Sequence, residues 1–172
     1  MITDKKLLDV TCGARSIWFN KRHPDAIYLD RRRVEFVQGF EGQVQKIVVD
    51  PDVVADFTDL PFEDETFSLV VFDPPYRFGL KNSWIRKKYE TYDDAGEMMY
   101  NIVRGFRECM RVLKPDGVLV FKWAEIQIST SEIIKAVGHT PLFGHRSGKK
   151  SNTHWLCFMK GAMGHDLRKV LP

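Results

Sequence analysis

FSLVVFDPPY, residues 67–76, begins as a continuous apolar run and ends on an acid, two prolines and a tyrosine. A short run of this kind is typical of a buried strand in a parallel sheet, because both faces of such a strand are covered. Pro74 and Pro75 each remove a backbone donor and fix φ, so the strand must stop at Asp73. The stretch therefore predicts one buried strand with a rigid turn at its carboxyl end.

Segments on both sides of this run carry further strand signals. Short apolar runs at residues 7–11, 26–30 and 117–123 are bounded by charge, glycine or proline, as strands usually are. Residues 45–50 and 52–57 compete for the position of the third strand. Pro51 lies between them and prevents one unbroken strand.

Two helices are predicted in the second half of the chain. The first has apolar residues at three-and-four spacing, namely Met99, Ile102, Val103, Phe106, Met110 and Leu113. Asp94 and Glu97 have the spacing of a capping box at its start. Ser129 and Glu132 repeat that spacing before a shorter helix, which should stop at Gly138.

The alternation of strand and helix predicts an α/β fold, namely a Rossmann-like, doubly wound, mostly parallel sheet. Residues 141–145 and 153–160 flank a polar loop and predict a C-terminal antiparallel hairpin strand. The 172 residues amount to one domain. We therefore expect residues 1–172 to form a single domain without a separate target-recognition domain.

Composition indicates a cytoplasmic protein. No apolar run approaches the roughly 18 residues of a membrane span, and Asp9 interrupts the only apolar stretch that could serve as a signal peptide. Neither the three cysteines nor the five histidines show metal-ligand spacing. We expect free thiols, no membrane contact and no metal.

In open α/β sheets, ligands bind beyond the carboxyl ends of the strands, so residues there are candidates for a site. Gly13 follows the first strand in a turn before an expected helix, where backbone can approach a ligand; a tight structural turn is the alternative. Asp30 ends the second strand and could bind both hydroxyls of a ribose, or cap a helix at residues 31–36. Asp56 could accept from an adenine amino group beside the N–H of Phe57, or form a turn.

The turn at residues 73–76 suits a planar amino group on an aromatic base. Asp73 and the carbonyl of Pro74 can accept the two amino hydrogens, while Tyr76 stacks on the ring. The alternative is a proline turn that only ends a strand. The chemistry of the turn favours a role in binding a base.

These motifs resemble those of class I S-adenosylmethionine-dependent methyltransferases, in particular the amino-methyltransferases whose fourth motif reads (D/N/S)PP(Y/F/W). DPPY at residues 73–76 matches that pattern, LLDVTCG at 7–13 resembles the first motif, and ADFTDLPF at 55–62 the third. RVLKPDGVLVFKW at 111–123 is similar to the helix, turn and strand that follow the active-site strand. The resemblance spans roughly residues 7–160, and the overall pattern is similar to small phage and prophage methyltransferases.

The resemblance implies S-adenosylmethionine as cofactor and methyl transfer to an exocyclic amino nitrogen of a nucleobase, preferably adenine N6 in DNA. The alternatives are an RNA guanine N2 or small-molecule methyltransferase, or a non-catalytic cofactor-binding module. By resemblance, Asp30 holds the ribose, Asp56 and Phe57 hold the adenine, and a catalytic motif spans residues 73–76. The implied site residues are Asp9, Thr11, Cys12 and Gly13 around the methionine moiety, and Asp73, Pro74, Pro75 and Tyr76 at the reacting base, with Asp73 also among the cofactor-binding residues.

Two departures from the family pattern bear on these roles. The glycine loop usually reads D-x-F-x-G-x-G, but its last position here is Arg15, which would crowd the cofactor or pair with its carboxylate. LPFEDETF at residues 60–67 resembles the LPFxDxxF pattern of small-molecule methyltransferases. The sequence therefore combines features of two groups.

Basic residues gather in two stretches that the fold should bring to the ligand edge. Cations there would hold phosphates and make binding depend on salt, although a solvated surface is the alternative. The candidate nucleic-acid contacts are Arg77, Lys81, Trp84, Arg86, Lys87, Lys88, Arg146, Lys149 and Lys150, with Tyr89 also available for stacking. A base in duplex DNA would have to be flipped out. Nucleic acid is the expected partner, DNA over RNA, and sequence specificity would come from short loops, a recognition partner or a second copy of the chain, or would be low.

Overall fold

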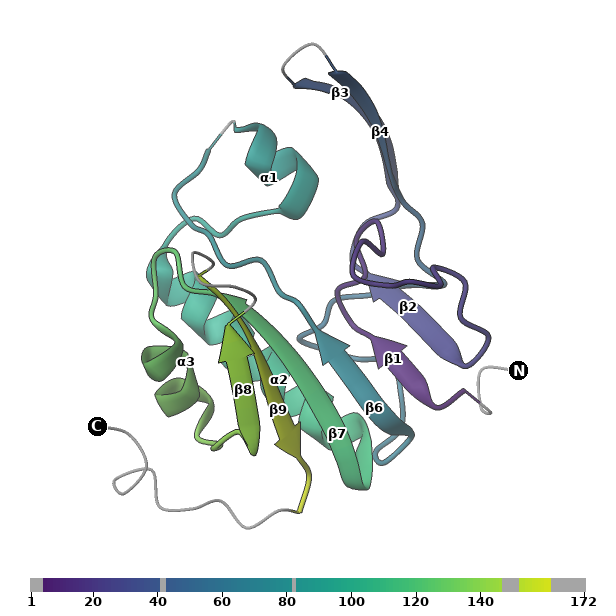
Figure 1. Ribbon diagram of the computed structural model, residues 1–172, viewed down its shortest axis with the longest axis vertical. Helices are drawn as coiled ribbons and strands as arrows, with labels where there is room; N and C mark the ends of the chain where they lie inside the picture. The colour runs from purple at the N-terminus through teal and green to yellow at the C-terminus, as the bar shows by residue number, and fades with distance from the viewer. Residues whose placement is uncertain (1–4, 41–42, 82, 147–151, 162–172) are drawn as a thin grey trace.

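A seven-stranded sheet forms the centre of the computed structural model, which describes residues 5–40, 43–81, 83–146 and 152–161 (Figure 1). The strand order is β5-β2-β1-β6-β7-β9-β8. The strands are β1 Leu7–Asp9, β2 Ala26–Asp30, β5 Val53–Val54, β6 Phe67–Phe72, β7 Leu113–Ala124, β8 Phe143–Arg146 and β9 Thr153–Met159.

The strand directions confirm the predicted fold class. β9 is antiparallel to both β7 and β8, whereas the other neighbours in the sheet pair in parallel. The C-terminal hairpin is therefore confirmed. β6 lies between β1 and β7, and Phe67, Val70 and Phe72 are fully buried on it, as the apolar run predicts.

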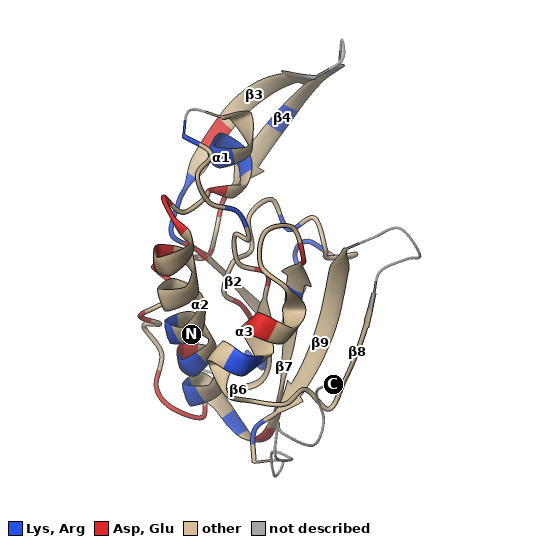
Figure 2. Cartoon of the chain, turned by 90° about the vertical axis from the view of Figure 1, so that its left-hand side faces the viewer, with Lys and Arg blue, Asp and Glu red and all other residues tan. Residues whose placement is uncertain are grey.

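Both predicted helices form, and Figure 2 shows them on the same side of the sheet. In α2 (Ala95–Val112), the Asp94 side chain accepts from the N–H of Glu97, but the Glu97 carboxylate accepts from Asp93 and not from Asp94. In α3 (Thr130–Val137), Ser129 and Glu132 form the complete capping box, and the helix ends at a left-handed Gly138. Among the described residues, no helix is both long and apolar enough to cross a membrane.

The centre of α2 approaches the sheet closely at Gly105. A Cβ atom at this position would lie 2.4 Å from Cδ2 of Phe57 and 2.9 Å from Cζ of Phe72. The two rings pack against each other at the end of β6 in a tilted arrangement, with centroids 5.3 Å apart. The absence of a side chain on Gly105 thus allows the helix to hold Phe57 beside the carboxyl end of the sheet.

The helix expected after Gly13 does not form. Residues 10–25 are turns, such as the one closed by the bond from the N–H of Arg15 to the carbonyl of Cys12. Trp18 packs with Cys12, Ala26 and Tyr28 in a small second core. The reason is that Asp9 binds the Trp18 indole at 2.6 Å and draws the segment back onto the sheet.

The segment after Asp30 also differs from the prediction, because residues 31–36 do not form a helix. Instead β3 (Val34–Phe40) and β4 (Gln43–Val49) pair as an antiparallel hairpin outside the sheet. Their many valines favour strand over helix. The third strand position is taken by β5, from the second of the two competing segments.

Two elements project beyond the carboxyl edge of the sheet and face each other in Figure 1. One is the β3–β4 hairpin. The other is a short helix, α1 (Trp84–Tyr89), which forms from the basic stretch after the proline turn. Ser83 begins α1, since its side chain accepts from the N–H of Arg86. The sequence did not predict this helix.

Candidate active site

A pocket of about 370 Å³ lies at the carboxyl ends of β1, β2 and β6. It brings together most of the cofactor and base-binding residues that the sequence singled out on separate segments. Its lining includes Thr11, Cys12, Gly13, Asp30, Phe57, Asp73, Pro74, Pro75, Tyr76 and Lys88. Asp9 and Asp56 are not among the lining residues.

The turn after β6 is fixed to the loop after β1. The N–H of Asp73 donates to Oγ1 of Thr11 at 2.8 Å. Pro74 is buried, and Tyr76 is half-buried against the hydrophobic core. The acid, the Pro74 backbone and the aromatic ring are therefore presented to the pocket from a supported turn.

Lys122 is a site residue that the sequence analysis missed. Its Nζ donates to Oδ2 of Asp73 at 2.6 Å. The register of the sheet places Phe121 beside Phe72, so the next residues on each strand also meet. A lysine in the otherwise apolar strand GVLVFKW was the available signal, but the sequence did not identify its partner.

Burial and the lysine shift the pKa of Asp73 in opposite directions. Burial raises the pKa of the Asp73 carboxyl, and the Lys122 ammonium lowers it without cancelling the rise. Because Lys122 contacts Oδ2, the other oxygen of the carboxylate remains available as an acceptor.

The loop after β1 contains two residues in the left-handed region, Gly13 (φ 48°) and Arg15 (φ 53°). The N–H of Gly13 donates to Oδ2 of Asp30 at 3.0 Å, which ties the loop to the end of β2. Position 15 is where the family pattern has glycine, the residue that adopts this backbone most readily. Arg15 adopts it as well.

The Arg15 side chain does not crowd the pocket. Its guanidinium donates to the carbonyls of Lys21 and Asp50 and lies 3.9 Å from the centre of the Tyr28 ring. Arg15 is not a lining residue of the pocket. The expectation that it would obstruct the cofactor, or pair with its carboxylate, is therefore not what the structure shows.

Asp9 lies beneath the loop and is only 1% exposed. Its Oδ1 accepts from the N–H of Thr11, and its Oδ2 accepts from Nε1 of Trp18. Burial raises the pKa of Asp9 to about 7. Asp9 therefore stabilises the conformation of the loop from beneath.

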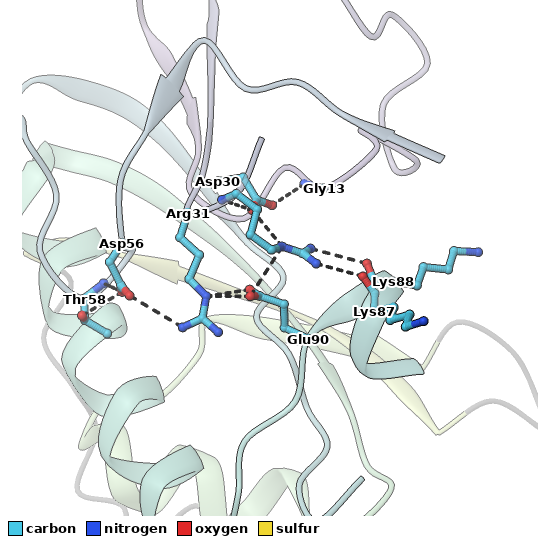
Figure 3. A network of polar contacts seen from close by, with 9 residues as sticks. Gly13, Asp30, Arg31, Asp56, Thr58, Lys87, Lys88 and Glu90 are labelled. Carbon is cyan, nitrogen blue, oxygen red and sulfur yellow. Dashed lines mark hydrogen bonds and ion pairs between the residues drawn. The ribbon is translucent and has the colours of Figure 1, made fainter. Parts of the chain in front are cut away.

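A network of arginines and acids borders the pocket (Figure 3). Nε of Arg31 donates to both carboxylate oxygens of Glu90 at 2.8 Å. Nε of Arg32 lies 3.5 Å from both Asp30 and Glu90. Two acids that were expected at the cofactor, Asp30 and Asp56, are thereby linked to α1 through arginines, since Arg31 also lies 3.8 Å from Asp56.

Asp56 makes the turn that was its alternative interpretation. Its Oδ1 accepts from both the N–H and the hydroxyl of Thr58 at 2.8 Å. Its Oδ2 faces Arg31 at the margin of the pocket. Phe57, by contrast, is a lining residue of the pocket.

The same network holds α1 over the pocket. The Arg32 guanidinium donates to the carbonyls of Lys87 and Lys88 at 3.1 and 3.4 Å. Glu90 follows the helix directly with φ of 62°, a backbone that favours glycine. Arg31, Arg32 and Glu90 were not predicted as site residues; the run of three arginines after Asp30 was the available signal.

The candidate nucleic-acid residues are only partly brought together. Lys88 lines the pocket, and Arg86 and Lys87 line a second cavity beside it, a groove between the β3–β4 hairpin and α1. Arg86 pairs with Asp93 at 2.8 Å, and Trp84 is exposed at the start of α1. Arg77 and Lys81 precede α1 and line neither cavity. Lys149, Lys150 and the side chain of Arg146 lie outside the described residues.

The described ranges hold no group of three or more His, Cys, Asp or Glu side chains arranged to bind a metal ion. The three cysteines, Cys12, Cys109 and Cys157, are free thiols.

Comparison with known proteins relates this arrangement to methyltransferases. The N-methyltransferase NodS from Bradyrhizobium japonicum WM9 superposes with a TM-score of 0.54 at 13% identity, covering 91% of this chain and 85% of that one. A SAM-dependent methyltransferase from Leishmania major gives 0.53 at 12% identity, covering 90% and 64%. The chain has the fold of class I SAM-dependent methyltransferases.

Sequence comparison gives a shorter match. Over 104 residues the chain is 31% identical to the type II beta methyltransferase M.BslI of Bacillus sp. (strain NEB-606). The match covers 60% of this chain and 9% of that protein, so the chain spans a small part of its curated relative's length. No protein-family model matches the chain.

Proposed function

We propose that the chain is an S-adenosylmethionine-dependent methyltransferase that acts on an exocyclic amino nitrogen of a nucleobase, with adenine N6 in DNA as the preferred target. One observation carries the proposal. The end of β6 places Asp73, Pro74 and Tyr76 in the same pocket as Gly13 and Asp30. A base-binding turn and a nucleotide-binding loop thus share one cavity.

The chemistry of the pocket fits the cofactor. Asp30 accepts from the N–H groups of Gly13 and Arg32 and from Nε of Arg32, and a carboxylate accepts about four hydrogen bonds, which leaves capacity at Oδ2 for a ribose hydroxyl. The left-handed Gly13 exposes backbone where a ligand can approach. Phe57 supplies an apolar wall suited to an adenine ring. When bound, S-adenosylmethionine supplies an activated methyl group on a sulfonium.

Asp73 then makes the target nitrogen reactive. The lone pair of an exocyclic amino group is delocalised into the ring, so the nitrogen is a poor nucleophile. A free oxygen of Asp73 and the Pro74 carbonyl accept the two amino hydrogens and localise that lone pair toward the methyl carbon. During transfer of the methyl group, the Asp73 carboxylate would stabilise the positive charge that develops on the nitrogen, which would afterwards lose a proton to water.

Cations beside the pocket favour a nucleic-acid substrate. Lys87 and Lys88 form no ion pair with any residue that the structure describes, so their ammonium groups remain available for phosphates. A target in a duplex must leave the base stack to reach Asp73.

The experiment that tests the proposal is transfer of a radiolabelled methyl group to duplex DNA, single-stranded DNA, RNA and a small-molecule extract, followed by mass spectrometry of the nucleosides. We expect N6-methyladenine in DNA. Label on RNA guanine or on a small molecule would contradict the preferred substrate. Cofactor binding by calorimetry without transfer to any acceptor would instead indicate a non-catalytic module.

A further inference from the structure

The β3–β4 hairpin has two faces of different chemistry. Residues on one face form the cross-strand pairs Val34 with Val49, Phe36 with Ile47, and Gln38 with Gln45, in order from the base outward. Ile47 and Val49 are 4% and 1% exposed, so this inner face packs against the body at its base. On the outer face, Val37, Val44 and Val48 are exposed. The inner face therefore carries apolar side chains near the sheet and amide side chains farther out.

The base of the hairpin is fixed beside the pocket. Arg33 pairs with Asp50 at 3.0 Å and donates to the carbonyl of Pro51 at 2.6 Å, which joins the two strands where they leave the body. Gln45 and Ile47 line the pocket itself. A target base at Asp73 would therefore have the hairpin as its neighbour.

A groove runs from the pocket between the hairpin and α1. Its volume is about 600 Å³, and both elements line it. It shares Arg31, Arg32 and Glu90 with the pocket, so the two cavities are adjacent. Lys87 on α1 faces the groove. A nucleic-acid backbone that follows this groove would pass the hairpin on one side and a free cation on the other.

We propose that the β3–β4 hairpin is a base-reading arm that enters the major groove of duplex DNA next to the flipped-out base, with Gln38 and Gln45 contacting base edges. This inference rests on the proposed function. Each strand has seven residues, which gives a ribbon roughly 23 Å long at about 3.3 Å per residue. The major groove of B-form DNA, about 12 Å wide, admits a two-stranded ribbon.

The amide pair is suited to reading adenine. A glutamine binds adenine through two bonds, since its carbonyl accepts from N6 and its amide donates to N7. Gln45 is exposed, whereas Oε1 of Gln38 is buried and has no hydrogen-bond partner among the described residues, so the Gln38 amide must rotate outward to contact a base. The arm requires duplex DNA, because the major groove of A-form RNA is too deep and narrow for side chains to read.

The test compares sequence preference in matched variants. Duplex DNA with randomised base pairs beside a target adenine is methylated, and the modified molecules are sequenced. We expect the wild type to prefer certain neighbouring base pairs, and Gln38→Leu/Gln45→Leu to lose this discrimination by roughly 5- to 150-fold for each base pair read. The control Val44→Thr/Val48→Thr changes exposed outer-face residues that line neither the pocket nor the groove, and it should keep the preference. Cofactor affinity, measured by calorimetry in each variant, separates loss of base reading from a disturbed pocket, and it should be unchanged in the outer-face control.

Gln45→Leu alone provides a milder change at an exposed position, should the double variant fold poorly, and it should weaken the same preference. Three outcomes would contradict the base-reading arm and leave the proposed function standing. They are a preference retained in the glutamine variants, no preference in the wild type, and equal methylation of single-stranded and duplex DNA. Cofactor binding without transfer to any nucleic acid would overturn both proposals.

Discussion

The end of β6 and the two projecting elements are held in place by different means. Asp73 follows a strand that lies between two others, and its backbone is bonded to the loop after β1. The hairpin and α1 stand outside the sheet, and arginine contacts near the pocket hold them. This difference indicates that the sheet fixes the position of Asp73. The residues suited to contacting a nucleic acid lie on elements outside the sheet, and the sequence of those elements can change without disturbing the sheet.

Asp73→Ala should have the largest effect, because it removes the acceptor at the reacting nitrogen. We expect kcat/KM to fall at least about 100-fold while cofactor affinity changes little. Radiolabelled transfer and calorimetry measure the two quantities. Asp59→Ala, at an exposed position away from the pocket, is the control. Turnover retained in Asp73→Ala would contradict the mechanism.

Lys122→Met should shift the pH dependence of the same centre. Asp73 must be ionised to accept the amino hydrogens, so activity falls as pH drops through its pKa. Burial raises that pKa and Lys122 lowers it, so loss of the lysine should move the acidic limb of the kcat/KM profile to higher pH. Lys122→Arg retains the cation and should keep the limb near its original position. A uniform loss of activity at every pH would assign Lys122 a packing role only.

Lys87→Gln/Lys88→Gln tests the projecting side of the comparison. Loss of both charges should weaken nucleic-acid binding by about 10-fold at low salt and reduce the slope of log affinity against log salt by roughly 1 to 2. Methyl transfer at saturating substrate should change little. Lys114→Gln/Lys135→Gln removes two exposed charges from β7 and α3 and is the matched control. Equal slopes in the two variants would exclude α1 as a phosphate-binding element.

Glu90→Gln should have the smallest and most local effect. It breaks the ion pairs to Arg31 and Arg32, which are partly exposed, so the global free energy of unfolding should change by no more than about 1 kcal/mol. Hydrogen exchange should accelerate in α1 and remain unchanged in β6. Unaltered exchange in α1 would show that the network does not hold this helix.

The sequence predicted the parts of the fold that depend on local patterns. The apolar run of β6, the spacing of α2, the capping box of α3 and the C-terminal hairpin each carry their own signal in consecutive residues. The turn at residues 73–76 was singled out for the same reason, because consecutive prolines end a strand regardless of what surrounds them.

What the sequence could not predict depends on contacts between distant segments. Lys122 meets Asp73 only because of the register between β6 and β7, and Arg31 and Arg32 meet Glu90 only because α1 folds back over β2. The β3–β4 hairpin was missed because its valine-rich strands pair with each other outside the sheet, whereas the prediction sought one more strand within it.

The short hydrogen bond between Asp9 and the Trp18 indole couples the protonation state of Asp9 to the fluorescence of Trp18. Because burial raises the pKa of Asp9 to about 7, the folded chain holds a proton that the unfolded chain releases near pH 4, and stability should fall as pH rises between these values. Ionisation of Asp9 changes the charge beside the indole ring, so Trp18 emission should titrate near pH 7 and lose that transition in Asp9→Asn. The loop that would cradle the cofactor thus carries an intrinsic fluorescent reporter of its own protonation.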